Sequence, residues 1–368
     1  MSGHNTNFTQ ATGNLGSVVL KELLSSGLFE LTVLTRGSST LTFPPEVKVV
    51  KVDYERLDSL TTALAGQDAL VSTLPSNVAA SQKLLIDAAV KAGVKRVIPT
   101  EYGCDLHNEL TRKLPVYAGK VQIEEYLEQL AVKGSISYTL VFNGPLLDLC
   151  LRQGLFFNFK DRKVDIYDGG EVPISTTRYE RSLPKVSLAP NVPLLPGHSR
   201  SISKCSLDIL VGCLRAFKTF KGKFFCHSFL KIYGRNKWLI PRSSRLTTVG
   251  KAVRRILTHP RETADRAVWV KDLDVTQNEL VKLAQALTPG EKWEVRQVDT
   301  VDLEKESLQQ LQKKEISPTT MLGFLRRAVF APGYGSTFKF THNDVLGISG
   351  MTEPDLHELV RSICSTGK

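Results

Sequence analysis

The sequence predicts an α/β protein: a doubly wound parallel β-sheet, followed by a smaller α/β region toward the C-terminus. Short apolar runs typical of buried strands alternate with helix-like amphipathic segments from residue 31 to residue 141. Such alternation favours a parallel sheet whose strands are joined by right-handed helical crossovers. A turn with two glycines, at residues 11–16, is followed directly by the first of these helix patterns. Together these observations indicate a sheet organised around the glycine turn.

The elements next to the turn follow from local patterns. Apolar residues recur at helical spacing after the turn, and Gly27 stands where a helix would end; they are Leu15, Val18, Val19 and Leu23. Residues 31–34 then form an apolar, β-rich strand pattern. The stretch before the turn is different, because residues 3–10 offer only Phe8 as an apolar side chain. A central parallel strand is usually a continuous apolar run, so we expect a poor first strand here.

The rest of the first half continues the alternation. Strands are predicted at residues 47–52, 69–73, 94–99 and 138–141, and helices at residues 57–64, 79–92 and 115–130. In sheets of this kind ligands bind outside the carboxyl ends of the strands. Those ends place a row of side chains and turns at one edge: Gly13, Arg36, Asp53, Leu74-Pro75, Thr100-Glu101-Tyr102 and Asn143-Gly144-Pro145. We therefore divide the chain into a dinucleotide-binding domain, residues 1–145, and a second region that starts at residue 146.

The second region has a looser pattern and is interpreted as a substrate-covering α/β region, residues 146–178 plus 245–368. Strands are predicted at residues 165–167, 172–174, 267–270 and 293–298, and helices at residues 248–257, 277–287, 302–314 and 318–330. The helix at 277–287 opens with a capping box, Thr276 with Glu279, in which each residue's side chain bonds the other's backbone N–H.

A dinucleotide phosphate suits the start of the first helix, where unpaired N–H groups and a partial positive charge meet an anion. The three glycine positions of the dinucleotide fingerprint correspond to Gln10, Gly13 and Gly16, so the first glycine is absent. Arg36 follows Gly16 by twenty residues at the end of a strand. An acidic residue there would bind the ribose 2′-hydroxyl of NAD, whereas arginine fits the 2′-phosphate of NADP. The alternative is a solvated surface arginine; with the glycine turn beside it, the pattern favours NADP(H).

Lys120 is the candidate for chemistry because it interrupts an apolar helix stripe formed by Val116, Ile123, Leu127 and Leu130. A lysine on a buried face is costly unless it is paired or deprotonated. It either snorkels to solvent at the edge of the stripe or faces the cofactor as a proton donor and acceptor. Tyr117 lies three residues before Lys120 rather than four, so the usual dehydrogenase Tyr–Lys couple is not supported. Glu101 and Tyr102 are secondary candidates, with a surface turn as the alternative.

Charge and composition restrict the class of protein. The 368 residues are 42% hydrophobic and carry a net charge of +11, which suggests nucleic acid or acidic membranes if it is spread evenly. Residues 179–244 hold twelve Lys or Arg against two acidic residues, so the other residues carry +1. No apolar run approaches the about 20 residues of a membrane helix, and the histidines and cysteines show no metal-ligand spacing. We expect a cytoplasmic protein that binds a small molecule, without metal, membrane or direct nucleic-acid binding; the oligomeric state stays open.

Residues 179–244 are interpreted as an insertion that is not part of the fold. Besides the charge, five prolines interrupt the stretch, at positions 184, 190, 193, 196 and 241, and its apolar patches match no neighbouring element. The codons of Arg178-Tyr179 can contain a splice donor GT, and the codon of Arg245 can contain an acceptor AG. We therefore predict a translated, unspliced intron, with residues 175–178 and 245–248 close in space at its base. The alternative is a basic insertion that docks on acidic lipid or nucleic acid.

Several motifs resemble the NmrA-like, isoflavone-reductase-like proteins, especially their fungal members, which are atypical short-chain dehydrogenases. The matching stretches are Ala-Thr-Gly-Asn-Leu-Gly at 11–16, Thr-Arg at 35–36, Ile-Pro-Thr-Glu-Tyr-Gly at 98–103, Asn143-Gly144-Pro145, residues 248–252 and residues 330–335. The resemblance implies a Rossmann fold and an NADPH-dependent reductase of small, often aromatic, substrates, with Lys120 as catalytic lysine and Arg36 on the 2′-phosphate. It also admits a dinucleotide-sensing transcriptional regulator without catalysis. The residues expected to contact the cofactor are Thr12, Gly13, Asn14, Leu15, Gly16, Arg36, Asp53, Thr73, Lys120 and Asn143.

Overall fold

The fold was analysed in a computed structural model of the chain. The structure describes residues 4–9, 11, 13–154, 157–158, 161–178, 248–315 and 317–366. Two of the residues discussed above, Gln10 and Thr12, lie outside the described residues, and so does the predicted insertion, 179–244.

A seven-stranded sheet forms the centre of the described chain, with strand order β10-β6-β5-β4-β1-β2-β3. Every neighbouring pair in it is parallel. The strands are β1 (His4–Thr9), β2 (Phe29–Arg36), β3 (Val47–Val52), β4 (Ala69–Ser72), β5 (Arg96–Ile98), β6 (Ser137–Phe142) and β10 (Arg266–Trp269). The chain runs outward from β1 to β3 and then returns to the other side of β1, so the switch point lies between β1 and β4. The predicted doubly wound parallel sheet is confirmed.

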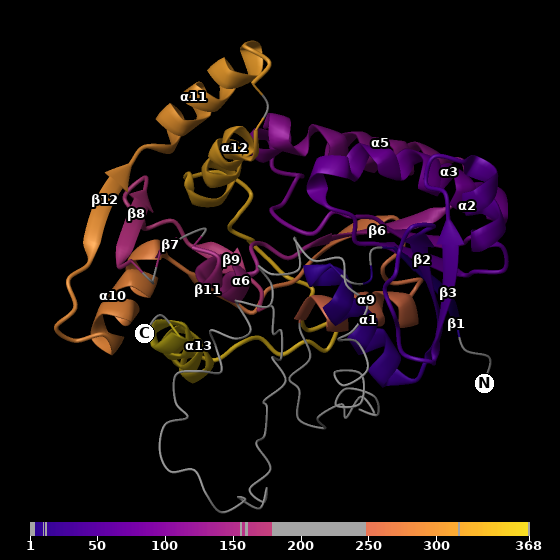
Figure 1. Ribbon diagram of the computed structural model, residues 1–368, viewed down its shortest axis with the longest axis horizontal. Coiled ribbons are helices and arrows are strands. Elements are labelled where there is room, and N and C mark those ends of the chain that lie inside the picture. The colour runs from indigo at the N-terminus through magenta and orange to yellow at the C-terminus, as the bar shows by residue number, and fades with distance from the viewer. Residues whose placement is uncertain are drawn as a thin grey trace, which may run out of the picture. The chain divides into compact units, whose positions relative to one another are not determined.

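Helices cover both faces of the sheet (Figure 1). One face packs against α1 (Asn14–Ser26) and α9 (Thr248–Thr258), which also contact each other. The opposite face packs against α2 (Leu57–Leu64), α3 (Gln82–Ala92) and α5 (Ala118–Val132). Two predicted helices begin with a 3-10 turn instead of α-helix: η1 (Ser76–Ser81) precedes α3, and η2 (Pro115–Tyr117) precedes α5.

The first strand forms in spite of its polar sequence. β1 pairs with β2 along its whole length and with β4 over residues 6–9. Thr6, Asn7 and Thr9 are all fully buried in it. The Asn7 amide donates to the carbonyl of Ala63 at 3.1 Å, whereas the Thr6 hydroxyl and the Asn7 side-chain oxygen have no partner among the described residues. Backbone pairing on both sides therefore outweighs the poor hydrophobic pattern that the sequence shows here.

The later part of the chain contributes to the main sheet as well as to smaller units. β10 adds the seventh strand beside β6, and α9 covers a face of the sheet, so the two regions divided at residue 145 share one sheet. Two small sheets lie outside it, one of β11 (Leu273–Val275) with β9 (Ile174–Thr176), the other of β12 (Glu294–Val298), β8 (Lys163–Tyr167) and β7 (Phe157–Asn158). β9 begins at Ile174, where the strand predicted for residues 172–174 ends; Pro173 precedes it and cannot donate to a ladder.

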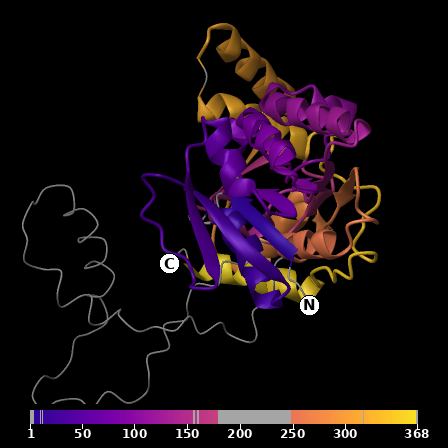
Figure 2. The ribbon, with the colours of Figure 1, turned by 90° about the vertical axis from the view of Figure 1, so that its right-hand side faces the viewer.

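The remaining helices complete the described chain. They are α4 (Glu109–Arg112), α6 (Leu147–Arg152), α10 (Gln277–Leu287), α11 (Thr300–Gln312), α12 (Pro318–Phe330) and α13 (Glu353–Thr366). The capping box of α10 is confirmed, since the Thr276 and Glu279 side chains bond each other's backbone N–H. Both ribbon views place α12 beside the start of α5, where it contacts η2 (Figures 1 and 2).

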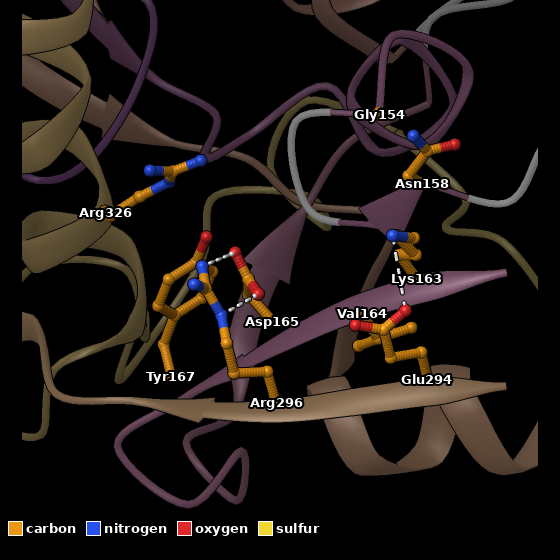
Figure 3. Close-up of a pocket in the computed structure, with 9 residues that line it drawn as sticks. All are labelled: Gly154, Asn158, Lys163, Val164, Asp165, Tyr167, Glu294, Arg296 and Arg326. Carbon is orange, nitrogen blue, oxygen red and sulfur yellow. Dashed lines mark hydrogen bonds and ion pairs between the residues drawn. The ribbon is translucent and has the colours of Figure 1, made fainter. Parts of the chain in front are cut away.

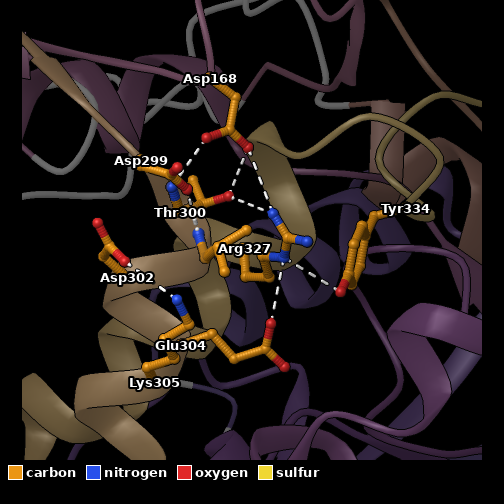
Figure 4. A network of polar contacts seen from close by, with 9 residues as sticks. Asp168, Asp299, Thr300, Asp302, Glu304, Lys305, Arg327 and Tyr334 are labelled. Atoms are coloured by element: carbon orange, nitrogen blue, oxygen red, sulfur yellow. Dashed lines mark hydrogen bonds and ion pairs between the residues drawn. The ribbon is translucent and has the colours of Figure 1, made fainter.

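A polar network fixes α12 to α11 and to the end of β8 (Figure 4). The Arg327 guanidinium donates to Thr300 Oγ1 at 2.7 Å and lies 3.2 Å from the carboxylate of Glu304. It also donates to the Tyr334 hydroxyl at 3.2 Å and stacks over that ring. Asp168 accepts from the backbone N–H of Thr300 at 2.8 Å. One arginine therefore joins the helix pair to the small sheet.

Membrane-spanning helices and metal-binding clusters are both absent from the described residues. None of their helices is both long and apolar enough to span a membrane. Among the same residues, no group of three histidine, cysteine or acidic side chains is placed to hold a metal ion.

Candidate cofactor site and active site

The glycine turn leads into a helix start that is open to a ligand. Gly13, which has no side chain, is the N-cap of α1, and the first turn of the helix contains no acidic residue that would compensate its N-terminus. Among the described residues no side chain caps these N–H groups, which is the arrangement that a phosphate uses. Asn14 is exposed, Gly16 is buried and Leu15 packs partly into the core, so Leu15 faces the protein rather than solvent.

Arg36 ends β2 at the same edge of the sheet. Its side chain is exposed and forms no ion pair with any residue that the structure describes. Its register partner on β3 is Val52, so Asp53 follows immediately beside it. Burial raises the pKa of Tyr54 to about 12, and the nearby charge of Arg36 acts in the opposite direction. The guanidinium is therefore free to receive a 2′-phosphate, although this exposure also suits a surface arginine.

The side chains of Asp53 and Thr73 each form a hydrogen bond to a backbone group of the protein. The Asp53 carboxylate accepts from the backbone N–H of Glu55 at 3.0 Å and is exposed. The Thr73 hydroxyl, directly after β4, donates to the carbonyl of Thr9 at 2.8 Å and so ties the ends of β4 and β1 together. Both residues follow strands at the carboxyl edge of the sheet. Each side chain already makes a hydrogen bond within the protein.

Asn143 directly follows β6 and is 1% exposed. Its amide donates to the hydroxyl of Thr177 and to the carbonyl of Gly144, each at 2.9 Å. The side-chain oxygen has no partner among the described residues. A buried acceptor without a donor is uncommon in proteins, and here it stands at the edge where the ligand of such a sheet binds. It fits a cofactor that supplies the missing donor.

Lys120 lies inside the protein, 3% exposed, which contradicts the snorkelling alternative. Its ammonium group reaches from α5 to the end of β5, where it donates to the carbonyls of Glu101 and, at 3.2 Å, Tyr102. Burial lowers the pKa of Lys120, and the charge of Glu101 opposes that shift. Two carbonyls therefore hold the amine at the ligand edge of the sheet, where burial makes it release a proton more readily than an exposed lysine does.

Glu101 is buried as well, so the surface-turn alternative for it is wrong. It is 1% exposed, and neither carboxylate oxygen has a hydrogen-bond partner among the described residues. Burial raises the pKa of Glu101 to about 7, with the charge of Lys120 acting against that rise. The Tyr102 hydroxyl is also buried without a described partner. The Glu101 carboxyl group and the Tyr102 hydroxyl therefore lie with Lys120 at the end of β5, and neither has a hydrogen-bond partner among the described residues.

Tyr117 does not form a dehydrogenase couple with Lys120. Its ring lies 5.9 Å from the lysine nitrogen, and its hydroxyl bonds with the thiol of Cys104. Burial raises the pKa of Tyr117 well above its usual value, and that of Cys104 too. Tyr117 therefore packs beside the lysine as a neutral side chain.

The sequence analysis missed a second polar cluster near Lys120. Glu124, one helical turn after Lys120 and 1% exposed, lies 3.0 Å from His107 Nε2 and 2.8 Å from the Arg112 guanidinium. The hydrogen bond that His107 donates to Glu124 is the main cause that raises the pKa of His107. The His107 ring also meets the rings of Phe142 and Trp269 edge-on, each at 5.5 Å. The sequence signal for this cluster is Glu124, an acidic residue on the same apolar stripe as Lys120. Its partners His107 and Arg112 lie outside that helix, so no helical spacing connects them with it.

A separate pocket of 310 Å³ lies on the small sheet of β7, β8 and β12 (Figure 3). Four of its charged side chains are paired across β8 and β12: Lys163 with Glu294 at 3.2 Å, and Arg296 with Asp165 at 2.9 Å. Arg326 also lines the pocket and lies 5.4 Å from the centre of the Tyr167 ring. None of the predicted site residues lines it. The candidate site is therefore the carboxyl edge of the main sheet, where the uncapped helix α1, Arg36, Asn143 and Lys120 fit a dinucleotide.

Comparisons with known proteins give a family model, curated oxidoreductases and solved reductase structures that are similar to this chain. Residues 6–153 match the model of the NmrA-like family. The chain is 25% identical over 357 residues to oxidoreductase aprR of Aspergillus flavus, a match that covers 96% of each chain. The crystal structure of isoflavone reductase shares the fold with a TM-score of 0.61 at 16% identity, over 99% of this chain and 100% of that one. A structure described as AtPrR2 with NADP⁺ and (+)pinoresinol also has a TM-score of 0.61, at 18% identity and 99% coverage of both chains. The chain is therefore an oxidoreductase whose residues 6–153 are similar to the NmrA-like family and whose fold is that of isoflavone and pinoresinol reductases.

Proposed function

We propose that this oxidoreductase uses NADPH to reduce a polarised double bond or carbonyl in a small, aromatic substrate. The observation that carries the proposal is the buried ammonium group of Lys120 at the ligand edge of the sheet, held by the carbonyls of Glu101 and Tyr102. Arg36, exposed at the end of β2 without an acidic partner among the described residues, supports NADPH rather than NADH. The NADP⁺ and pinoresinol named for AtPrR2 support the cofactor and the aromatic substrate class.

Each residue has a separate task in this reaction. The N-terminus of α1 binds the pyrophosphate, Arg36 the 2′-phosphate and the side-chain oxygen of Asn143 a donor of the cofactor. The bound NADPH supplies the hydride. Lys120 supplies the proton: an N–H bond of its ammonium group breaks as the reduced substrate gains that proton. Burial lowers the pKa of Lys120, which makes this release easier than from an exposed lysine.

The test replaces Lys120 by methionine, which keeps the length of the side chain and removes the amine. We expect kcat for an accepted enone or aromatic ketone to fall about 10²-fold or more, because general acid catalysis is lost. NADPH binding, followed by fluorescence, should persist. The matched control is Lys133→Met, which removes an exposed lysine from the end of the same helix. Full activity of the Lys120→Met enzyme would overturn the assignment, and NADPH binding without turnover of any such substrate by the unmodified chain would favour a dinucleotide-sensing regulator.

A further inference from the structure

The pocket on the small sheet of β7, β8 and β12 shares no residue with the proposed cofactor site or with Lys120. Its volume of 310 Å³ lies at the lower end of the range that small-molecule sites have. Three parts of the later chain build it: the segment after α6 with β7, the strand pair β8 and β12, and the helix α12. The charges that line this pocket determine which ligand fits it.

Two of the three cations in the described lining are neutralised by acids of the same strand pair. Arg296 donates to both carboxylate oxygens of Asp165, at 2.9 and 3.0 Å, and Lys163 lies 3.2 Å from Glu294. The third cation, Arg326, forms no ion pair with any residue that the structure describes. In Figure 3 no dashed line joins it to the other labelled side chains, whereas both ion pairs are marked. The described lining therefore carries one uncompensated positive charge.

Arg326 is held by an aromatic ring rather than by an acid. Its guanidinium carbon lies 5.4 Å from the centre of the Tyr167 ring, within the range of a cation–π contact. Tyr167 is 2% exposed and stacks on Phe330 with 4.6 Å between the ring centres, so the ring is fixed in turn. The Nε atom of Arg326 is buried and has no hydrogen-bond partner among the described residues. A buried donor without an acceptor is uncommon in proteins, so this guanidinium fits a ligand that supplies the acceptor.

We propose that this pocket binds the carboxylate group of a small organic acid, with Arg326 as the residue that holds it. A guanidinium presents its N–H donors in a plane that matches the two oxygens of a carboxylate. Asp165 and Glu294 line the same pocket and repel a second negative charge, whereas a single charge balances Arg326. The ligand class is therefore a monocarboxylate whose remaining atoms are uncharged.

The hydroxyl group beside Arg326 is compatible with an anion. Burial raises the pKa of Tyr167 to about 12, and the charge of Arg326 acts against that rise. The hydroxyl therefore keeps its proton at neutral pH and adds no negative charge to the pocket. Because the site uses neither the cofactor residues nor Lys120, its occupation can be measured without turnover.

The first experiment titrates the full chain with three probes by ligand-observed NMR. Benzoate carries one carboxylate, benzamide has the same ring without charge, and phthalate carries a second carboxylate. We expect benzoate to bind about tenfold or more tightly than benzamide, because a charge-assisted contact is absent from the amide. Phthalate should bind more weakly than benzoate because Asp165 and Glu294 repel its second charge. Equal affinity for benzoate and benzamide would overturn the proposal, and so would displacement of benzoate by an equal concentration of inorganic phosphate.

The second experiment changes the pocket residues. Arg326→Gln should weaken benzoate binding about tenfold or more, and Arg326→Lys, which keeps the charge and loses the planar donors, should fall between the two. The matched control is Arg56→Gln, which removes the same charge at an exposed helix N-cap and should leave benzoate binding unchanged. Glu294→Gln changes an exposed side chain and so tests the charge balance without a risk to folding. It should raise the affinity for phthalate, and an unchanged phthalate affinity would overturn the limit to one negative charge.

A third comparison separates this pocket from the proposed active site, since an aromatic acid could also enter there. Benzoate binding should persist in Lys120→Met and in the presence of saturating NADPH. Binding that is lost in Lys120→Met and kept in Arg326→Gln would place the acid at the carboxyl edge of the main sheet and overturn this inference. The reductase assignment would not be affected by that result, because it depends on turnover in the Lys120 variant.

Discussion

Single side chains at the carboxyl edge differ in how far the sequence could predict them. Lys120 was found because it interrupts an apolar stripe, a pattern carried within one helix. Glu101 was placed at a strand end, but its burial depends on α5 and on the turn after β5, which no local pattern specifies. His107 was assigned nothing, since its partner Glu124 lies on another element. Short-range sequence patterns therefore indicate which residues lie at the carboxyl edge of the main sheet. Whether those side chains are buried and which pKa shifts result depends on contacts between elements that lie far apart in the sequence.

The proposed preference for NADPH over NADH depends on one residue, Arg36. We expect Arg36→Asp to lower the preference for NADPH over NADH by about 1–3 kcal/mol, about 5- to 150-fold, because a charge-assisted contact with the 2′-phosphate becomes a repulsion. Fluorescence titration with each cofactor measures it. Arg56→Asp is the control, with the same charge change at an exposed helix N-cap after β3. Equal discrimination in the Arg36 variant and the unmodified protein would remove Arg36 from the site.

Helices and strands that depend on the spacing of apolar residues and on helix-capping residues can be predicted from the sequence. The pairing of strands that lie far apart in the chain cannot. β2 to β6 and α10 to α12 follow from apolar spacing, the capping box and turn residues. β10 was expected as a strand, but its place beside β6 comes from pairing across a long connection. No local pattern predicts α4, α6, β7, β11 or α13; of these, α4, β7 and β11 are at most four residues long.

Burial of an unpaired hydroxyl group in β1 lowers the free energy of unfolding, and a substitution can measure this effect. Thr6 is fully buried, and its hydroxyl has no partner among the described residues. Valine has nearly the same shape and no hydroxyl, so Thr6→Val should raise the free energy of unfolding by about 1 kcal/mol. Thr139→Val is the control: that buried hydroxyl donates to the carbonyl of Thr263 at 2.6 Å and accepts from Arg96 at 2.8 Å, so its loss should destabilise. Urea unfolding measures both, and a destabilised Thr6→Val protein would contradict this account.

For the whole molecule, the described residues on either side of the 179–244 stretch meet at one side chain. The two oxygens of Asp272 accept from the backbone N–H of Arg178 and from the hydroxyl of Thr248, each at 2.6 Å. If residues 179–244 were removed, residues 245–247 would remain between these two groups and could reach about 10 Å when extended. The short distance across Asp272 is within that reach. We propose on this basis that residues 179–244 are not part of the fold and derive from an unspliced intron.

Deletion of residues 179–244 tests this proposal. We expect the shortened protein to keep its melting temperature and NADPH binding, and to be more soluble because the apolar patches in the sequence of this stretch are gone together with its twelve cationic side chains. Circular dichroism and fluorescence titration measure the first two properties. A variant with a short Gly-Ser linker at the joint controls for strain. Unfolding of both shortened proteins, or transcripts that always retain the stretch, would show that it belongs to the protein.

The position of β10 has a consequence for synthesis. β6 is the outer strand of the sheet until β10 pairs with it, and the chain between them includes the 179–244 stretch. That stretch roughly doubles the loop, which costs only about 0.6 kcal/mol in closure entropy. The delay on the ribosome is the larger effect, because the backbone groups along β6 stay unpaired while the extra residues are translated. A nascent chain with an open strand edge is prone to pair with another copy, so the longer message should yield more aggregate even where the finished proteins are equally stable.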